Sequence, residues 1–291
     1  MTYPAAGADR LSAEEVAARA AQRAGVSVQI VHDLPGMSAV VRLLHVIWRP
    51  EADNPLVTVE LLRALAHSGN YVSGAFEGDR MVGACVGFLA APPGMALHSH
   101  VAGVSPDVRG RGAGAALKLH QRAWAVEQGL TTITWTADPL VRRNAYFNLA
   151  KLGARPVEYL VDFYGEIGDA VNAGQGTDRL LLRWDITSAL VDDTVNGFSP
   201  DIESEVLVVD EAVSALAVSA AGHPVVGELE AGSVRLVQVP ADIEAIRQAD
   251  AELAREWRFA VRRVLGQLLG GGSRITGFTK DGCYVVEGGK R

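Results

Sequence analysis

Two histidines and a glycine-rich loop lie close together in one short stretch of the sequence. His98 and His100 stand in an apolar run that is typical of a strand, and residues 109–114 read Arg-Gly-Arg-Gly-Ala-Gly. A helical pattern follows from Ala115 to Gln128. A glycine-rich loop that leads into a helix presents backbone N–H groups to an anion, and the missing Cβ atoms let a pyrophosphate approach closely. The stretch therefore predicts a phosphate-binding loop next to a pair of imidazoles.

The spacing of the glycines separates this loop from two common nucleotide-binding loops. A dinucleotide-binding loop needs G-x-G-x-x-G, and a P-loop needs G-x-x-x-x-G-K-[ST]. Gly110, Gly112 and Gly114 follow G-x-G-x-G instead, and no Lys-Ser or Lys-Thr pair comes after them. Neither of these two nucleotide loops is therefore expected.

The loop and its lead-in resemble one family. The pattern R-x-x-G-x-G starts at Arg109 after Val104-x-Pro106, which is similar to the pyrophosphate signature of the GNAT family of CoA-dependent N-acyltransferases. The resemblance implies that acetyl-CoA or succinyl-CoA is the co-substrate. Ala102 and Gly103 are small enough for a β-bulge, where backbone groups would face the CoA arm. The expected CoA-binding residues are Ala102, Gly103, Val104, Arg109, Gly110, Arg111, Gly112, Ala113, Gly114 and Asn144.

The histidine pair is the candidate base. Residues i and i+2 of a strand point to one face, about 6.5 Å apart, so His98 and His100 can face one pocket. A histidine has an ordinary pKa near 6.5 and can take a proton at neutral pH. The pair also resembles the His-x-His of the arylalkylamine N-acetyltransferase branch, which assists deprotonation of the amine. Two structural histidines are the alternative; zinc is a weaker one, because no third ligand of suitable spacing is visible.

The proton donor is where the sequence departs from the family pattern. The family's usual tyrosine corresponds here to Leu149, four residues before Gly153. Tyr146 lies about one helical turn earlier and can reach the same face. Tyr146 is therefore the candidate acid, and Asn144 resembles the asparagine of the same motif that contacts CoA.

Candidate residues for binding the acceptor amine lie near the end of the strand predicted at residues 131–136. Asp138 could bind an ammonium group, Trp135 could line the pocket, and Arg179 could hold a carboxylate. The overall pattern resembles a long bacterial GNAT subgroup, some of whose members N-succinylate amino acids. The resemblance implies a small amine or an amino acid as the acceptor.

The elements that must position these residues follow the order β-α-α-β-β-β-α-β-α-β-β. We expect a capped helix that begins after Ser12, with Glu15 completing a capping box, and ends at Gly25. Strands are predicted at residues 28–34, 71–76, 81–89, 97–104, 131–136, 156–164 and 178–184. Helices are predicted at residues 37–48, 58–66, 115–128 and 141–151. This order matches the GNAT fold, an α/β fold with a mixed central sheet and helices on both faces.

A smaller α+β region is expected at the C-terminal end. Predicted strands cover residues 206–209, 215–219, 234–239, 274–278 and 283–287, and one long amphipathic helix covers residues 241–269. The resulting domain prediction is an N-terminal helix (1–27), a GNAT acyltransferase domain (28–186), a linker (187–204) and the C-terminal region (205–291).

Composition narrows the class of protein. The chain has 291 residues, 48% hydrophobic and 21% charged, and a formal charge of −7. The acidic balance argues against nucleic-acid and anionic-membrane partners. Cys85 and Cys283 are predicted to be buried free thiols, and no metal site is expected. We expect a cytoplasmic protein, with a homodimer as a possible assembly.

These patterns together predict an acyl-CoA-dependent N-acyltransferase. A CoA-binding sensor or assembly protein without transfer activity is the main alternative, because the family tyrosine is missing and the chain is long. A GNAT fold that carries out another acyl-CoA reaction, such as decarboxylation, is a third.

Overall fold

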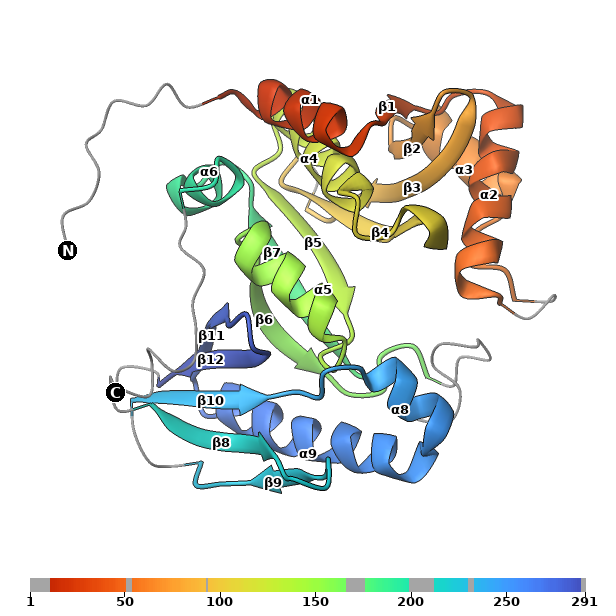
Figure 1. Cartoon of the computed structure of the whole chain (residues 1–291). Coiled ribbons are helices and arrows are strands. Elements are labelled where there is room, and N and C mark those ends of the chain that lie inside the picture. The colour runs from red at the N-terminus through yellow and green to blue at the C-terminus, as the bar shows by residue number, and fades with distance from the viewer. Residues whose placement is uncertain are drawn as a thin grey trace. The chain divides into compact units, whose positions relative to one another are not determined.

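The computed structural model describes residues 11–50, 54–92, 94–165, 176–198, 212–229 and 233–288. The chain divides into two compact units. Unit 1 takes its described residues from 1–47, 55–133 and 186–198, and unit 2 takes its described residues from 48–54, 134–185 and 199–291. Figure 1 shows the elements of both units.

Unit 1 contains the N-terminal helices and the first four strands. In chain order these are α1 (Ala13–Ala24), β1 (Ser27–Ile30), α2 (Leu34–Trp48), α3 (Val59–His67), β2 (Tyr71–Glu77), β3 (Arg80–Leu89), β4 (Ala96–Val104), a 3-10 turn (Pro106–Val108), α4 (Ala113–Glu127) and α6 (Ala189–Val195). β1 to β4 pair with their sequence neighbours in antiparallel fashion. α1 and α4 pack side by side (Figure 1). The Ser12–Glu15 capping box begins α1, and Gly25 ends it with φ 66°, both as predicted.

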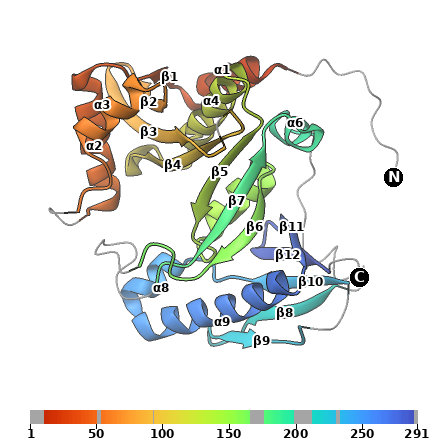
Figure 2. The same ribbon diagram turned by 180° about the vertical axis from the view of Figure 1, so that it is seen from behind.

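Unit 2 contains the remaining elements. They are α5 (Arg142–Tyr146), a π-helical turn (Phe147–Lys151), β6 (Arg155–Leu160), β7 (Arg179–Asp185), β8 (Val213–Val218), β9 (Pro224–Val226), β10 (Val234–Gln238), α8 (Ile243–Ala249), α9 (Ala251–Gly270), β11 (Arg274–Phe278) and β12 (Cys283–Glu287). β8 to β12 form a sheet in the order β11-β12-β10-β8-β9. α9 packs against β8 and β9 of this sheet (Figures 1 and 2).

The larger sheet confirms the predicted α/β class. It has seven strands in the order β1-β2-β3-β4-β5-β7-β6, and β5 (Thr132–Ala137) passes from unit 1 into unit 2 after Ile133. The second sheet near the C-terminus confirms the smaller α+β region. Cys85 and Cys283 are both buried and free, as predicted.

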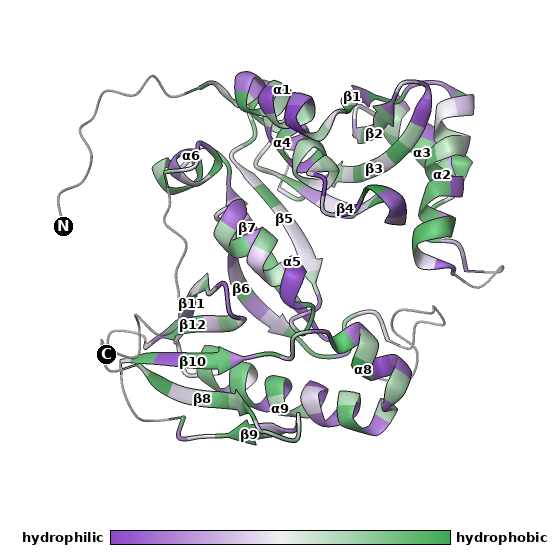
Figure 3. Ribbon diagram, viewed as in Figure 1, coloured by the Kyte–Doolittle hydropathy of each residue, from purple (hydrophilic) through white to green (hydrophobic). Residues whose placement is uncertain are grey.

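The long helix predicted for residues 241–269 is wrong in one respect, because the chain forms two helices there. Asp250 has an extended backbone (φ −149°, ψ 94°), and its carboxylate accepts the N–H of Leu253. An Asp side chain in this position satisfies the first turn of the following helix, so it ends α8 and begins α9. Figure 3 shows hydrophilic and hydrophobic residues alternating along α9, as the amphipathic pattern predicted.

Smaller differences concern the ends of elements. The segment predicted as a linker contains α6, which Ser188 caps by accepting the N–H of Val191. The strand predicted to reach Tyr164 ends at Leu160, because Asp178 and Thr177 accept the N–H groups of Asp162 and Tyr164 and form a turn instead. The strand predicted at residues 28–34 ends at Ile30, and β9 was not predicted. The strand predicted at residues 206–209 lies outside the described residues.

Candidate functional site

The glycine-rich loop forms the N-terminus of α4 in unit 1. Gly110 and Gly112 have φ angles of 78° and 92°, a region that glycine adopts without a steric penalty. Gly112 is the N-cap residue of α4, and no side chain caps this helix. The first N–H groups of a helix have no partner within it, and the helix dipole adds partial positive charge there. The loop therefore has the geometry of an anion-binding site.

The two arginines of the loop differ in their surroundings. Arg111 forms an ion pair with Glu77 at 2.6 Å, and Arg80 contacts the same carboxylate at 2.6 Å. Arg109 is exposed and forms no hydrogen bond or ion pair with the residues that the structure describes. Arg109 is therefore the guanidinium that is available to an incoming anion, whereas Arg111 is partly neutralised.

The loop is preceded by an acidic side chain that also has partners. Asp107 accepts hydrogen bonds from Ser105 and from Arg80, the latter at 2.7 Å. These contacts, of which the Ser105 hydrogen bond is the strongest, lower the pKa of Asp107 to about 2. Asp107 is therefore ionised but is engaged with Arg80 at the side of the loop.

The histidine pair lies on β4, in the same unit as the loop. The ring centroids of His98 and His100 are 6.5 Å apart, and both rings contact the ring of Phe88, at 5.1 and 5.9 Å. Burial lowers the pKa of both imidazoles, and the charges of His100 and Lys118 lower that of His98 further. Because the pKa of each is below its ordinary value, both rings are mainly neutral at pH 7 and can accept a proton.

Against β3 there is no bulge at Ala102 and Gly103, where one was predicted, because these residues pair regularly with Cys85 and Ala84. The register of β4 against β3 shifts instead at His100, since Val86 faces Val101 and Gly87 faces Ser99. A Cβ atom on Gly87 would lie 3.0 Å from the carbonyl oxygen of His98. The irregularity therefore occurs where a glycine on the neighbouring strand allows close approach of the two backbones.

Sequence analysis missed a polar cluster behind the histidines, between β4 and α4. Lys118 is 5% exposed, and its ammonium group donates to Ser99 Oγ at 3.1 Å and to Gln121 Oε1 at 2.9 Å. The amide nitrogen of Gln121 lies 3.2 Å from Cys85 Sγ. Burial lowers the pKa of Lys118 to about 8. A signal was available, because Lys118, Gln121 and Ala125 share the helical spacing of a buried face.

The acceptor residues predicted from sequence belong to unit 2, and Asp138 is already engaged there. Its carboxylate accepts hydrogen bonds from Arg258 at 2.7 and 2.9 Å and from Arg247 at 2.6 Å. Burial alone would raise the pKa of Asp138, but the two arginines bring it below its ordinary range. Asp138 therefore already has two arginine partners within unit 2, and its role toward an ammonium group stays a prediction.

Trp135 and Arg179 are also largely enclosed in unit 2. Trp135 is 7% exposed and packs edge-on against Trp184, with ring centroids 5.9 Å apart. Arg179 is 9% exposed, donates to the carbonyl oxygen of Asp178 at 2.9 Å and lies over the ring of Tyr164. Both side chains therefore pack into the interior around β5 and β7.

The candidate acid also belongs to unit 2. Tyr146 is half-buried at the end of α5, and the ammonium group of Lys151 lies 5.1 Å from its ring centroid. Asn144 is exposed on the same short helix, whereas Leu149 is 3% exposed. The π-helical turn that begins at Phe147 changes the helical spacing, so the α-helical alignment of Tyr146 with position 149 does not hold. Such turns are frequent at functional sites.

No group of three or more His, Cys, Asp or Glu side chains in the described part of the chain is arranged to hold a metal ion. None of the described helices combines the length and the apolar character needed to cross a membrane.

The fourth strand of the α/β sheet leads into a glycine-rich loop at the N-terminus of α4, an arrangement that suits an anionic phosphate group. The family can be stated more closely, because residues 38–153 match the model of the Acetyltransferase (GNAT) family. The chain therefore carries a GNAT acetyltransferase domain over these residues. Members of this family use acyl-CoA, and the uncapped loop around Gly112 fits a phosphate-bearing ligand.

Solved structures of acetyltransferases are similar to this chain at low identity. Ard1 from Thermoplasma volcanium is 14% identical, with 55% of this chain and 96% of that chain covered and a TM-score of 0.42. The ribosomal-protein-S18-alanine N-acetyltransferase from Escherichia coli is 13% identical, with 56% and 96% covered and a TM-score of 0.44. Naa50 from Arabidopsis thaliana, in complex with a bisubstrate analogue, is 18% identical, with 55% and 97% covered and a TM-score of 0.43. No curated protein matches the sequence.

Proposed function

We propose that the protein transfers an acyl group from CoA to the amine of a small molecule. The observation that supports this proposal most directly is the pair of neutral imidazoles on β4, the strand that leads into the uncapped loop. One strand thereby connects a candidate base with a candidate pyrophosphate site. The acyl group we expect is acetyl or succinyl, and the acceptor is an amine or an amino acid.

The histidines would supply the proton acceptor. An alkylammonium group has a pKa of about 10, so the acceptor is mostly protonated at pH 7 and must lose a proton before it attacks. His98 or His100 takes this proton, directly or through a water molecule. The amine nitrogen then forms a bond with the thioester carbonyl carbon, and the bond from that carbon to the CoA sulfur breaks. The nitrogen then loses its second proton and the departing thiolate takes one up, so that the products are a neutral amide and the CoA thiol.

The loop would hold the co-substrate by its diphosphate. The backbone N–H groups of Gly110 and of residues 112–114 donate to the phosphate oxygens, and Arg109 adds a positive charge. Ala102, Gly103 and Val104 offer backbone groups to the pantetheine arm. We assign Trp135, Asp138 and Arg179 the role of keeping the end of β5 in place, rather than direct contact with the acceptor.

A thiol-release assay tests the proposal. Acetyl-CoA and succinyl-CoA are each offered with a panel of amines and amino acids, and free CoA is measured. We expect release that depends on the amine, and a fall in kcat of about 100-fold in the double variant His98→Gln/His100→Gln, within the usual range for loss of a general base. His32→Gln, an exposed histidine of the same unit, is the matched control. Unchanged turnover in the double variant would remove the histidines from the mechanism.

A second candidate is supported by Leu149, which is buried where the family has its tyrosine. In that case the protein binds acyl-CoA without transferring the acyl group. Calorimetry distinguishes the two candidates, because binding of acetyl-CoA together with no amine-dependent thiol release would favour a sensor. Release of carbon dioxide from malonyl-CoA without any amine would indicate a decarboxylase.

A further inference from the structure

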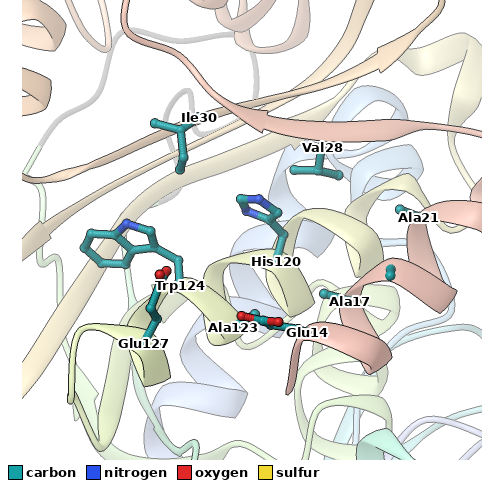
Figure 4. A pocket seen from close by; sticks show the side chains of 10 residues that line it. Glu14, Ala17, Ala21, Val28, Ile30, His120, Ala123, Trp124 and Glu127 are labelled. Carbon is teal, nitrogen blue, oxygen red and sulfur yellow. The ribbon is translucent and has the colours of Figure 1, made fainter. Parts of the chain in front are cut away.

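Unit 1 contains a pocket that the acyl-transfer proposal does not use. It has a volume of about 350 Å³ and opens between α1, β1 and α4 (Figure 4). Ala17, Ala18 and Ala21 of α1 line it, together with Ala123 of α4. Alanines let two helices pack closely while they leave the space beyond their Cβ atoms empty. The volume lies at the lower end of the range for small-molecule sites.

The walls of the pocket are apolar and include one aromatic ring. Val28 and Ile30 of β1 form one wall, and Trp124 of α4 forms another (Figure 4). The ring of Trp124 packs against the buried ring of Tyr71, with centroids 5.2 Å apart. This contact holds the half-exposed indole in place, so the pocket has a fixed aromatic surface.

His120 adds a polar group but no positive charge. Its Nδ1 atom lies 2.8 Å from the hydroxyl oxygen of Tyr71, and this hydrogen bond fixes the orientation of the imidazole. Burial raises the pKa of Tyr71 well above its ordinary value and lowers the pKa of His120. Both groups are therefore mainly neutral at pH 7.

The charged groups of the pocket are both acidic. Glu14, in the first turn of α1, and Glu127, at the end of α4, line the pocket from opposite helices (Figure 4). No lysine or arginine is among the lining residues, all of which belong to the described part of the chain. An aromatic ring together with two carboxylates and no cation favours a positively charged ligand, since ammonium groups bind to carboxylates and over indole rings.

The pocket is separate from the histidines and the loop. α4 presents Lys118 and Gln121 to the sheet, where Lys118 contacts Ser99. Alternate residues of a strand point to opposite faces, so His98 on β4 points away from the side on which α4 packs. None of the residues proposed for acyl transfer lines the pocket.

We propose that this pocket binds a small organic cation with an apolar body, separately from the amine that is acylated. The apolar part of the ligand lies against the lining alanines of α1 and α4, beside Val28 and Ile30. The ammonium group lies over Trp124 and between the two glutamates. Because α4 also carries the phosphate loop at its other end, an occupied pocket stabilises the helix that both sites share.

Benzyltrimethylammonium is a suitable probe, because it has no N–H bond and cannot be acylated. Calorimetry on the full-length chain should show saturable 1:1 binding of this cation and no binding of benzenesulfonate, an aromatic anion. In the double variant Glu14→Gln/Glu127→Gln we expect at least a tenfold loss of affinity. Ala123→Leu, which fills the pocket, should abolish binding. Glu158→Gln, an exposed glutamate of unit 2, is the matched control and should bind as the unmodified protein does.

Acetyl-CoA binding, measured on the same variants, checks that the site is separate. It should be unchanged in the double variant, in which both substituted residues are exposed. The proposal is overturned if the cation does not bind, if it binds the double variant or Ala123→Leu as strongly as the unmodified protein, or if benzenesulfonate binds equally well. Loss of acetyl-CoA binding in the double variant would contradict the separation of the two sites. None of these outcomes depends on turnover, so the acyl-transfer proposal is tested independently.

Discussion

The predicted site residues of the two units differ in how far their charged groups already have partners. In unit 1 Arg109 is exposed at the loop, burial lowers the pKa of His98 and of His100, and the buried ammonium group of Lys118 donates to Ser99 and Gln121. In unit 2 Asp138 is surrounded by arginines. Groups that are to bind a ligand must remain available, whereas groups that are saturated internally stabilise the fold. We therefore propose that ligand binding depends mainly on the predicted site residues of unit 1.

The ion pairs of unit 2 connect segments that are far apart in sequence. Arg247 of α8 and Arg258 of α9 bind Asp138, which follows β5 directly. Arg262 of α9 binds Asp178 at 2.7 Å, and Asp178 also accepts the hydroxyl of Tyr159 at 2.7 Å. The C-terminal helices are therefore part of the same compact unit as the strands of residues 134–185, rather than an independent attachment.

The largest expected effect is the loss of stability when the charge of Asp138 is removed. Asp138→Asn leaves Arg247 and Arg258 without their counter-charge, and breaking a buried ion pair costs about 3–5 kcal/mol. We expect the free energy of unfolding to fall by roughly 3 kcal/mol in urea denaturation. The side chain is 10% exposed, so little of this effect is screened by water.

The control for this change is Asp185→Asn. Asp185 pairs with Arg183 at 2.8 Å, but both side chains are more than half exposed. An exposed pair contributes less than about 1 kcal/mol. A similar loss of stability in both variants would mean that the arginines around Asp138 have no special structural role.

The next largest effects concern two glycines of the loop. Substituting each of them separates a loss of stability from a loss of affinity for acetyl-CoA. Gly112→Ala places a side chain at φ 92°, which costs about 1–2 kcal/mol of stability. Gly114→Ala lies in the first turn of α4 at an ordinary angle, and its Cβ would lie 4.0 Å from Val104, so stability should be unchanged or slightly higher. If the backbone at Gly114 approaches the CoA diphosphate, this variant loses affinity for acetyl-CoA while it keeps its stability.

Calorimetric titration with acetyl-CoA and thermal denaturation on the same two variants provide the measurement. Full affinity in Gly114→Ala would place the diphosphate away from this turn. Loss of both stability and affinity in Gly112→Ala alone would leave the loop with only a structural role.

A smaller effect is expected for the two arginines of the loop, Arg109 and Arg111, which should contribute unequally to the affinity for acetyl-CoA. Arg109→Ala removes a cation that has no partner among the described residues, and we expect about a tenfold loss of affinity for acetyl-CoA, equivalent to about 1.4 kcal/mol. Arg111→Ala should cost less, because Glu77 already neutralises that guanidinium. The difference should shrink as salt is added. Equal losses in both variants would contradict the assignment of Arg109 as the available cation.

The sequence allowed the order of elements and the loop to be predicted because both depend on local signals. Glycine spacing, the Ser12–Glu15 capping box and strand alternation act over a few residues. The partners of Asp138 lie 109 and 120 residues away along the chain, and no local pattern connects Asp138 with an arginine of α9. The sequence therefore did not show that two arginines already engage Asp138.

The irregularity of β4 is a second feature that the local sequence did not locate. Ala102 and Gly103 have the small side chains that a bulge tolerates, but the register also depends on the neighbouring strand. Gly87 lies on β3, more than ten residues earlier, and allows the close approach at His100. Which of two small-residue positions becomes irregular is therefore a property of the pair of strands.

The smallest expected effect is a change in the pKa of His98 when Lys118 is replaced. It tests whether His98 of unit 1 is the proposed base. Lys118→Met removes a buried positive charge that disfavours protonation of His98, so the pKa of His98 should rise toward its ordinary value. A base must be unprotonated to act, so the acid limb of the pH profile of kcat should move to higher pH. Proton NMR of the imidazole measures the same change without any substrate.

Leu119→Met is the matched control, because Leu119 is also buried on α4 and the change keeps the side chain apolar. It should leave both the pKa of His98 and the pH profile unchanged. A Lys118→Met protein that loses stability but keeps the pH profile would show that Lys118 only joins α4 to β4. A shift of the NMR titration without a shift of the kinetic profile would instead show that His98 feels the charge of Lys118 but is not the group whose protonation limits the reaction.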